Sequence, residues 1–239
     1  MSIFSLIVAR KGSKGLPNKV VRKINGKYVF QYSVEYSCSL SDIIKEEVVT
    51  AVSSDCEEIK EYCAGQNVVF IDRQAHLASD QVKIEEVIYD AYSKGGNRCE
   101  YVSLLYGNIP TRYPEEFKRA FDFLEAHTDY DAALSMQNVE KYNPAWMFAL
   151  HEELLPEKDL RGYRRQDLEQ FMIHDGHTIL FRAGYFVRFM ESRRAARKMY
   201  EQFGEKIKPV LCNRLIIDVD TERDLIAAEA ILKYNNGGV

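Results

Sequence analysis

The sequence of 239 residues has few cysteines, no long hydrophobic run and no excess of positive charge. Its five cysteines are scattered without Cys-x-x-Cys spacing, so we expect no zinc site, and we expect reduced thiols, as in the cytoplasm. No apolar run approaches the ~20 residues of a membrane-spanning helix, and a strand directly after Met1 leaves no room for a signal peptide. The net charge of −4 argues against a general nucleic-acid binder. We therefore expect a cytoplasmic protein that binds small molecules, and neither nucleic acid nor membrane.

The most informative stretch is a short apolar run followed at once by a basic loop. Residues 5–9 (SLIVA) are expected to form a buried strand, and residues 10–19 (RKGSKGLPNK) follow it. Gly12 and Gly15 allow a tight turn that brings backbone N–H groups close to a ligand. Four cations in the loop add a positive field, which suits a polyphosphate. The loop matches neither the Walker A motif nor the dinucleotide motif Gly-x-Gly-x-x-Gly. The alternative is a solvated basic loop after an edge strand.

Strands and helices are expected to alternate along most of the chain. The predicted strands are residues 5–9, 47–53, 67–71, 101–105, 132–136, 177–181 and 214–220. The predicted helices are residues 29–40, 54–63, 79–91, 114–124, 183–200 and the stretch that follows a capping box at 221–224. Such alternation predicts parallel strands with helices on both faces of the sheet. The expected fold is a Rossmann-like three-layer αβα domain spanning residues 1–239, with a mostly parallel sheet. Residues 137–175 show no clear period and are predicted to form an inserted arm.

Two aspartates near the carboxyl end of the chain suggest a metal site. In open α/β sheets ligands bind at the carboxyl ends of the strands. The stretches that this rule gathers at one rim are residues 10–19, 53–55, 106–112 and 218–220. Asp218 and Asp220 lie two apart on the predicted strand, so their side chains would share a face. Mg²⁺ takes one or two carboxylates together with phosphate oxygens, so the pair suits it. The alternative is that Asp220 or Thr221 caps a helix and Asp218 is a solvated strand end.

Six stretches, in order along roughly residues 5–230, resemble the motifs of the CMP–sialic acid synthetases and related cytidylyltransferases. ARKGSKGLPNKV resembles A-R-x-G-S-K-G-x-P-x-K-N, and SSDCEEI resembles S-T-D-x-x-x-I. DR with HLASD resembles R-P-x-x-L-A-S-D, and LLYGNIPTR stands where that family has L-L-Q-P-T-S-P-L-R. RQDL followed by DG resembles R-Q-x-L followed by N-G, and IDVDTE resembles I-D-I-D-T-E. The resemblance implies an enzyme that transfers CMP from CTP to a 2-keto sugar acid, with Mg²⁺ as cofactor.

The resemblance also implies roles for particular residues. The residues implied to bind the nucleotide are Ala9, Arg10, Gly12, Ser13, Lys14, Lys19, Arg73, Ser79 and Asp80. Those implied to bind the sugar acid are Tyr106, Asn108, Arg165, Gln166 and Asp175. The implied catalytic residues are Arg10, Lys14, Lys19 and Asp218, and the implied Mg²⁺ ligands are Asp218 and Asp220. The family is dimeric, so residues 137–175 would reach the partner's site and Arg165 would pair with the sugar carboxylate. Alternatively, Arg161, Arg164 and Arg165 form a solvated face of the arm.

The departures from the family pattern fall mostly on the acceptor side. Val20 replaces an Asn, Tyr106 replaces the Gln that faces the sugar, and Asp175 replaces an Asn. Asn108 and Ile109 stand in place of Thr and Ser. The acceptor therefore stays open among sialic, pseudaminic, legionaminic and 3-deoxy-octulosonic acids, or a non-sugar acid. Two other readings remain: a non-catalytic nucleotide-binding homologue, and a nucleotidyltransferase for a sugar 1-phosphate with a different base.

Overall fold

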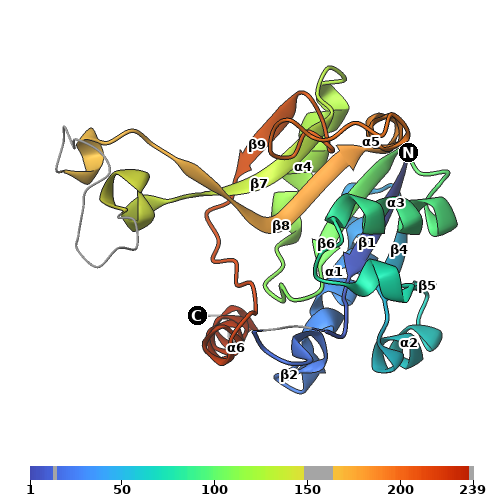
Figure 1. Cartoon of the computed structure of the whole chain (residues 1–239). Coiled ribbons are helices and arrows are strands. Elements are labelled where there is room, and N and C mark those ends of the chain that lie inside the picture. Colours follow the sequence, from blue (N-terminus) through green and yellow to red (C-terminus); the bar gives the residue numbers. More distant parts are fainter. Residues whose placement is uncertain (13–14, 148–163, 237–239) are drawn as a thin grey trace.

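The computed structural model describes residues 1–12, 15–147 and 164–236, and in this part of the chain a seven-stranded sheet forms the centre of the molecule (Figure 1). Its strands are β1 (Ser2–Val8), β4 (Glu47–Ser54), β5 (Val69–Asp72), β6 (Tyr101–Tyr106), β7 (Ala132–Asn138), β8 (Met172–Arg182) and β9 (Ile207–Leu211). Their order is β5-β4-β1-β6-β8-β7-β9. β1, β4, β5 and β6 are parallel, as are β7 and β9, whereas β8 runs antiparallel to β6 and β7. The prediction of a mostly parallel sheet is confirmed, with β8 as the exception to strict alternation.

Helices cover both faces of the sheet. They are α1 (Val29–Ile44), α2 (Glu57–Ala64), α3 (Ile84–Gly95), α4 (Pro114–Ala126), α5 (Ala183–Glu191) and α6 (Glu222–Asn236). Successive residues of β1 point to opposite faces, as in any strand. Ile3 and Ile7 join the core under α1, α2 and α4, whereas Phe4 and Leu6 join the core under α3 and α5. The three-layer αβα architecture is therefore the one that the sequence predicts.

The carboxyl-terminal third of the chain departs from the prediction in two places. Residues 214–220 form no strand, and the last strand is β9 instead. Pro209 lies within β9, which weakens its strand signal, but proline is tolerated at a sheet edge. The predicted helix 183–200 ends at Glu191, and Arg193 follows with a φ of 53° that no helix adopts.

The start of α3 is also later than predicted. Ser79 and Asp80 do not cap this helix, because Lys83 is its N-cap residue. A separate short 3-10 helix, η2 (Ala75–Ala78), precedes them. Ser79 and Asp80 thus lie in a connection between η2 and α3, where their side chains can face a ligand.

The segment between β7 and β8 projects away from the sheet (Figure 1). β7 and β8 continue their antiparallel pairing out to Asn138 and Met172. Two short 3-10 helices, η3 (Glu140–Tyr142) and η4 (Pro144–Trp146), extend from the end of β7, and η5 (Arg165–Asp167) precedes β8. The predicted arm, residues 137–175, corresponds to this projection, although its residues 148–163 lie outside the described residues.

Helix α6, near the carboxyl end of the chain, packs against the basic loop near the amino end. Its Ala228 and Leu232 pack with Leu16 of the basic loop and with Val219. The predicted capping box is confirmed, because Thr221 Oγ1 accepts the Asp224 N–H at 3.3 Å and an Asp224 oxygen accepts the Thr221 N–H at 2.8 Å. None of the described helices is both long and apolar enough to cross a membrane.

Candidate functional site

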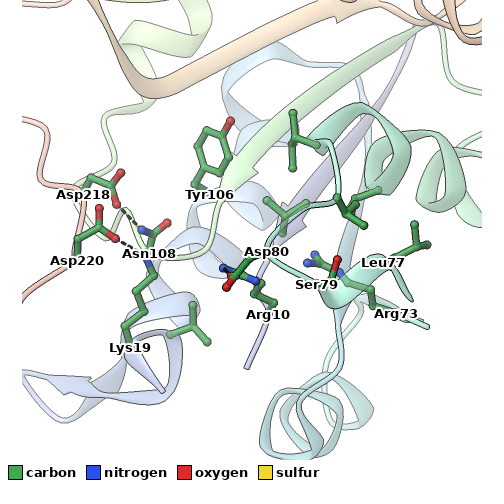
Figure 2. Close-up of a pocket in the computed structure, with 15 residues that line it drawn as sticks. Arg10, Lys19, Arg73, Leu77, Ser79, Asp80, Tyr106, Asn108, Asp218 and Asp220 are labelled. Atoms are coloured by element: carbon green, nitrogen blue, oxygen red, sulfur yellow. Dashed lines mark hydrogen bonds and ion pairs between the residues drawn. The ribbon is translucent and has the colours of Figure 1, made fainter. Parts of the chain in front are cut away.

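A cavity of about 400 Å³ opens at the carboxyl ends of the parallel strands. Figure 2 shows its two sides: Lys19, Asn108, Asp218 and Asp220 gather on one, and Arg10, Arg73, Ser79 and Asp80 on the other. The strand-end rule predicts this place for a ligand, and the structure brings the basic loop and the acidic pair together there. Apolar side chains also line the cavity: Val20, which stands where the family motif has Asn, and the side chains of Val8, Leu77, Val82, Ile84 and Val87.

The basic loop contacts the acidic segment directly. The Lys19 ammonium forms an ion pair with Asp220 Oδ1, although 201 positions separate these residues. Gly15 explains how the backbones come so close, because a Cβ atom at this position would lie 2.7 Å from the Asp220 carbonyl oxygen. Lys11 fixes the other end of the loop by donating its N–H to Asp55 at 2.7 Å. The predicted residues Ser13 and Lys14 lie outside the described residues.

Arg10 and Arg73 place two guanidinium groups on the opposite side of the cavity. Arg10 forms an ion pair with Asp80 and donates to the Ala78 carbonyl oxygen at 3.2 Å, which ties the loop to the residues before α3. Arg73 is buried and donates to the Ser53 hydroxyl at 3.1 Å and the Ser53 carbonyl at 2.7 Å. Burial lowers the pKa of Arg73 to about 10, so this guanidinium remains a cation at neutral pH. On this side of the cavity an anionic ligand would meet the guanidinium groups of Arg10 and Arg73.

The acidic pair is held by the loop after β6 rather than by the sheet. Asn108 donates its side-chain amide to Asp218 Oδ1 and its carbonyl oxygen accepts the Val219 N–H at 2.9 Å. The Thr111 hydroxyl accepts the Ile217 N–H at 2.9 Å. The premise that the aspartates share a face of a strand is therefore wrong, yet both line the cavity. Their position depends on residues about a hundred positions earlier in the chain.

The surroundings of Asp218 disfavour its charge. The side chain faces the open cavity, but the protein wall behind it removes water, and Asp220 adds a second negative charge. Burial first, and Asp220 second, raise the pKa of Asp218 to about 6. Among the described residues, no three His, Cys, Asp or Glu side chains converge as metal ligands. Two carboxylates that line one cavity are a donor set of the kind that Mg²⁺ takes together with phosphate oxygens and water.

This pKa predicts that Asp218→Asn stabilises the ligand-free protein at neutral pH. The ordinary pKa is 3.8, so the folded state binds the proton more tightly than the unfolded state, and stability is lost as pH rises from about 4 to about 6. Asparagine cannot ionise, so the melting temperature at pH 7.5 should rise by roughly 2–4 °C, and by less near pH 4.5. Thermal unfolding without nucleotide or divalent ions measures this, with exposed Asp42→Asn as control. If the melting temperatures of Asp218→Asn and the unaltered protein differed equally at both pH values, the raised pKa of Asp218 would not be the cause.

The remaining predicted residues divide between the cavity and other places. Ala9 is buried at the end of β1, and Gly12 lies in the exposed part of the loop. Tyr106 lines the cavity, and burial raises its pKa to about 12, so its phenol stays protonated. Asp175 is off the cavity wall, where its Oδ1 accepts the Ser135 hydroxyl and the His177 N–H. Its Oδ2 is buried without a hydrogen bond from any described residue.

The backbone of Arg165 and Gln166 lies in the arm, away from the cavity of this chain. Both lie on η5, which sits toward the outer end of the projecting arm (Figure 1). The structure also identifies Arg112, to which the sequence analysis assigned no role. Its partly buried guanidinium donates to the carbonyl oxygens of Tyr106 at 2.7 Å and His177 at 2.6 Å. In the sequence, the one signal for Arg112 is its position at the end of the LLYGNIPTR stretch, where the similar family motif also has Arg.

A sequence model of the cytidylyltransferase family matches residues 4–225, which include every residue of the cavity. The chain belongs to the cytidylyltransferase family. The match confirms the resemblance seen in the six motifs, from the basic loop to the IDVDTE stretch.

Named relatives of this cytidylyltransferase chain act on different sugar acids. It is 28% identical to an N-acylneuraminate cytidylyltransferase of Streptococcus agalactiae over 95% of its length, but spans about half of that protein (52%). It is also 28% identical to a pseudaminic acid cytidylyltransferase of Campylobacter jejuni, covering 99% of this chain and 98% of that one. A CMP-N,N'-diacetyllegionaminic acid synthase of Legionella pneumophila is 25% identical over 98% of both chains. The names of these relatives agree on the transfer of CMP and differ in the acid that accepts it.

Solved structures agree on the fold. A CMP:2-keto-3-deoxy-manno-octonic acid synthetase complexed with CTP superimposes with a TM-score of 0.73 at 15% identity, covering 98% of this chain and all of that one. A 4-diphosphocytidyl-2C-methyl-D-erythritol synthase of Anaerococcus prevotii superimposes with a TM-score of 0.63 at 16% identity, covering 97% of this chain and 96% of that one. At these identities the likeness establishes the nucleotidyltransferase fold of this cytidylyltransferase chain and not its substrate.

Proposed function

We propose that this protein activates a sialic-acid-like 2-keto sugar acid by transferring CMP to it from CTP. The observation that carries the proposal is the cavity in which the cations of the basic loop face Asp218 and Asp220. A nucleoside triphosphate and a divalent cation need these opposite charges at one place. The family and the names of the relatives support cytidine as the base and a nonulosonate as the acceptor.

The residues of the cavity divide the task between them. Arg10, Lys14 and Lys19 would bind the triphosphate, and Arg73 with Ser79 would line the nucleotide pocket. Asp218 and Asp220 would hold Mg²⁺, because in each carboxylate Oδ1 accepts one hydrogen bond from a described residue while Oδ2 accepts none. When bound, Mg²⁺ would supply positive charge to the phosphate oxygens.

The proposed reaction is a displacement at phosphorus. A hydroxyl oxygen of the sugar acid attacks the α-phosphorus of CTP and forms a new P–O bond. The bond from that phosphorus to the bridging oxygen of the β-phosphate breaks, pyrophosphate leaves, and the hydroxyl proton is released to solvent. Arg10 and Lys19, fixed before the substrate binds, would stabilise the charge that develops on the phosphate oxygens.

We also propose that the protein is a homodimer formed through residues 137–175 and located in the cytoplasm. The described part of the arm exposes apolar side chains, including Tyr142 (64% exposed), Met147 (57%) and Ile173 (59%). A second cavity, of about 790 Å³, lies between the arm and residues 212–215. Large exposed apolar patches commonly mark association surfaces. A partner's arm would bring Arg165 and Gln166 to the acceptor end of the site, which their own chain does not.

Pyrophosphate release tests the proposed function. The protein is incubated with CTP, Mg²⁺ and, in turn, N-acetylneuraminic, pseudaminic, legionaminic and 3-deoxy-octulosonic acids. We expect release with at least one of the three nonulosonic acids. Turnover with 3-deoxy-octulosonic acid alone would show that this acid, and not a nonulosonic acid, is the acceptor. Silence with all four, while CTP still binds, would favour the non-catalytic nucleotide-binding reading.

A thermal-shift comparison tests the base. A ligand that binds only the folded protein raises its melting temperature. With Mg²⁺ present we expect CTP to give a larger shift than UTP, GTP or ATP at equal concentration. A larger shift with another triphosphate would favour the reading as a nucleotidyltransferase for a sugar 1-phosphate.

A further inference from the structure

Asn108 occupies a turn that is fixed from both sides. The N–H of the preceding Gly107 donates to the Val8 carbonyl at 2.9 Å, which ties the turn to the end of β1. A Cβ atom on Gly107 would lie 2.8 Å from the Ala9 Cβ, so only glycine allows this approach. On the other side, the Asn108 carbonyl oxygen accepts the Val219 N–H at 2.9 Å. The backbone of Asn108 therefore connects the first strand to the acidic segment.

Two polar side chains hold the remainder of this turn. The Arg112 guanidinium donates to the Tyr106 carbonyl at 2.7 Å, and the Ser33 hydroxyl donates to the Ile109 carbonyl at 3.1 Å. Both anchors lie outside the cavity wall. Because the turn is anchored before and after Asn108, the Asn108 side chain starts from a fixed position, as a preorganised donor requires.

The side-chain amide of Asn108 points at Asp218 and not into open solvent (Figure 2). Its Nδ2 donates to Asp218 Oδ1 and lies 3.4 Å from the Val219 carbonyl oxygen. An ionised carboxylate only accepts hydrogen bonds, so the amide nitrogen and not the amide oxygen must face it. This contact orients Asp218, because it fixes one carboxylate oxygen and leaves Oδ2 for another partner.

We propose that Asn108 is a positioning residue for Asp218: its amide holds Oδ1 and thereby presents Oδ2 to a divalent cation. The inference rests on the proposed function only in that Asp218 is taken as a ligand of this cation. It differs from the role that the family resemblance implies, in which Asn108 contacts the sugar acid. The similar motifs carry Thr at this position, so the Asn108–Asp218 contact is a feature of this chain.

Mn²⁺ binding tests the inference without turnover. Free Mn²⁺ is followed by electron paramagnetic resonance during titration of the protein with CTP present and the acceptor acid omitted. We expect N108A to weaken Mn²⁺ binding by about tenfold or more, as loss of a residue that orients a metal ligand typically does. N108L, which keeps the side-chain volume without the donor, should give the same loss and covers the case in which N108A fails to fold. Exposed Asn67→Ala serves as the matched control.

A double-mutant cycle separates positioning from a general structural effect. In the background of Asp218→Asn, replacement of Asn108 should no longer change Mn²⁺ affinity, because the oriented oxygen is no longer a carboxylate oxygen. Steady-state kinetics add a second comparison: an acceptor contact would raise the KM for the sugar acid and leave Mn²⁺ affinity intact. That result, or unchanged Mn²⁺ binding in both Asn108 variants, overturns the inference. Absence of Mn²⁺ binding by the unaltered protein would instead reject the metal site of the proposed function.

Discussion

Asp218→Ala should reduce the rate of CMP transfer by about 10³-fold, the upper range for removing one group that stabilises a transition state. Alanine removes the carboxylate that Asn108 orients and leaves Asp220, itself paired with Lys19, as the remaining acidic ligand. Mg²⁺ would then bind too weakly to neutralise the phosphates during displacement. Pyrophosphate release at saturating CTP and sugar acid measures the loss.

The same variant should keep its fold and its affinity for CTP in the absence of divalent ions. The cations that would hold the triphosphate come from the basic loop and not from the acidic segment. Exposed Asp42→Ala on α1 is the matched control and should retain full activity. Near-normal turnover by Asp218→Ala would mean that the acidic pair does not hold the metal.

Lys19→Ala should lower kcat/KM for CTP by about 10²-fold, as expected for loss of one charged donor to the phosphates. Lys19 lies on the short helix η1 (Lys19–Val21), and its ammonium reaches the cavity, where it is paired with Asp220. The substitution removes one positive charge from the phosphate site and leaves Asp220 without its partner. The net charge that an incoming triphosphate meets becomes more negative by one unit, and the unpaired Asp220 carboxylate then faces it directly.

Lys118→Ala is the matched control for Lys19. Lys118 also forms an ion pair with an aspartate, Asp122, but lies on the exposed surface of α4. Steady-state kinetics of both variants, with CTP varied at saturating sugar acid, give the comparison. Equal kcat/KM values for Lys19→Ala and the unaltered protein would show that this ammonium does not contact the phosphates.

The sequence predicts the parallel core well because the signals there are local. Each strand such as β1 is a short apolar run that ends in turn residues, and each following helix shows helical spacing of apolar residues. The antiparallel direction of β8 has no local signal, because the residues between β7 and β8 carry no clear period. Residues 214–220 resemble a strand in sequence, but in the structure they form no strand and bond instead to Asn108 and Thr111 in the loop after β6.

The candidate site is predictable in its charges and not in its arrangement. The cations of the basic loop and the spacing of Asp218 and Asp220 can be read from the sequence, and the strand-end rule brings them to one rim. The raised pKa of Asp218, the hydrogen bonds of Arg112 and the direction of the Asn108 amide depend on packing between distant segments. No periodicity or motif contains this information.

The contact between Lys19 and Asp220 has a consequence for how the protein matures on the ribosome. The loop emerges early in synthesis, but its acidic counterpart follows 201 residues later. At ~5–20 residues per second this delay amounts to roughly 10–40 s. During that interval Lys19 lacks its partner Asp220, and a chain terminated before residue 220 would never acquire it. Asp218 and Asp220 can therefore join the cavity only after synthesis has passed residue 220.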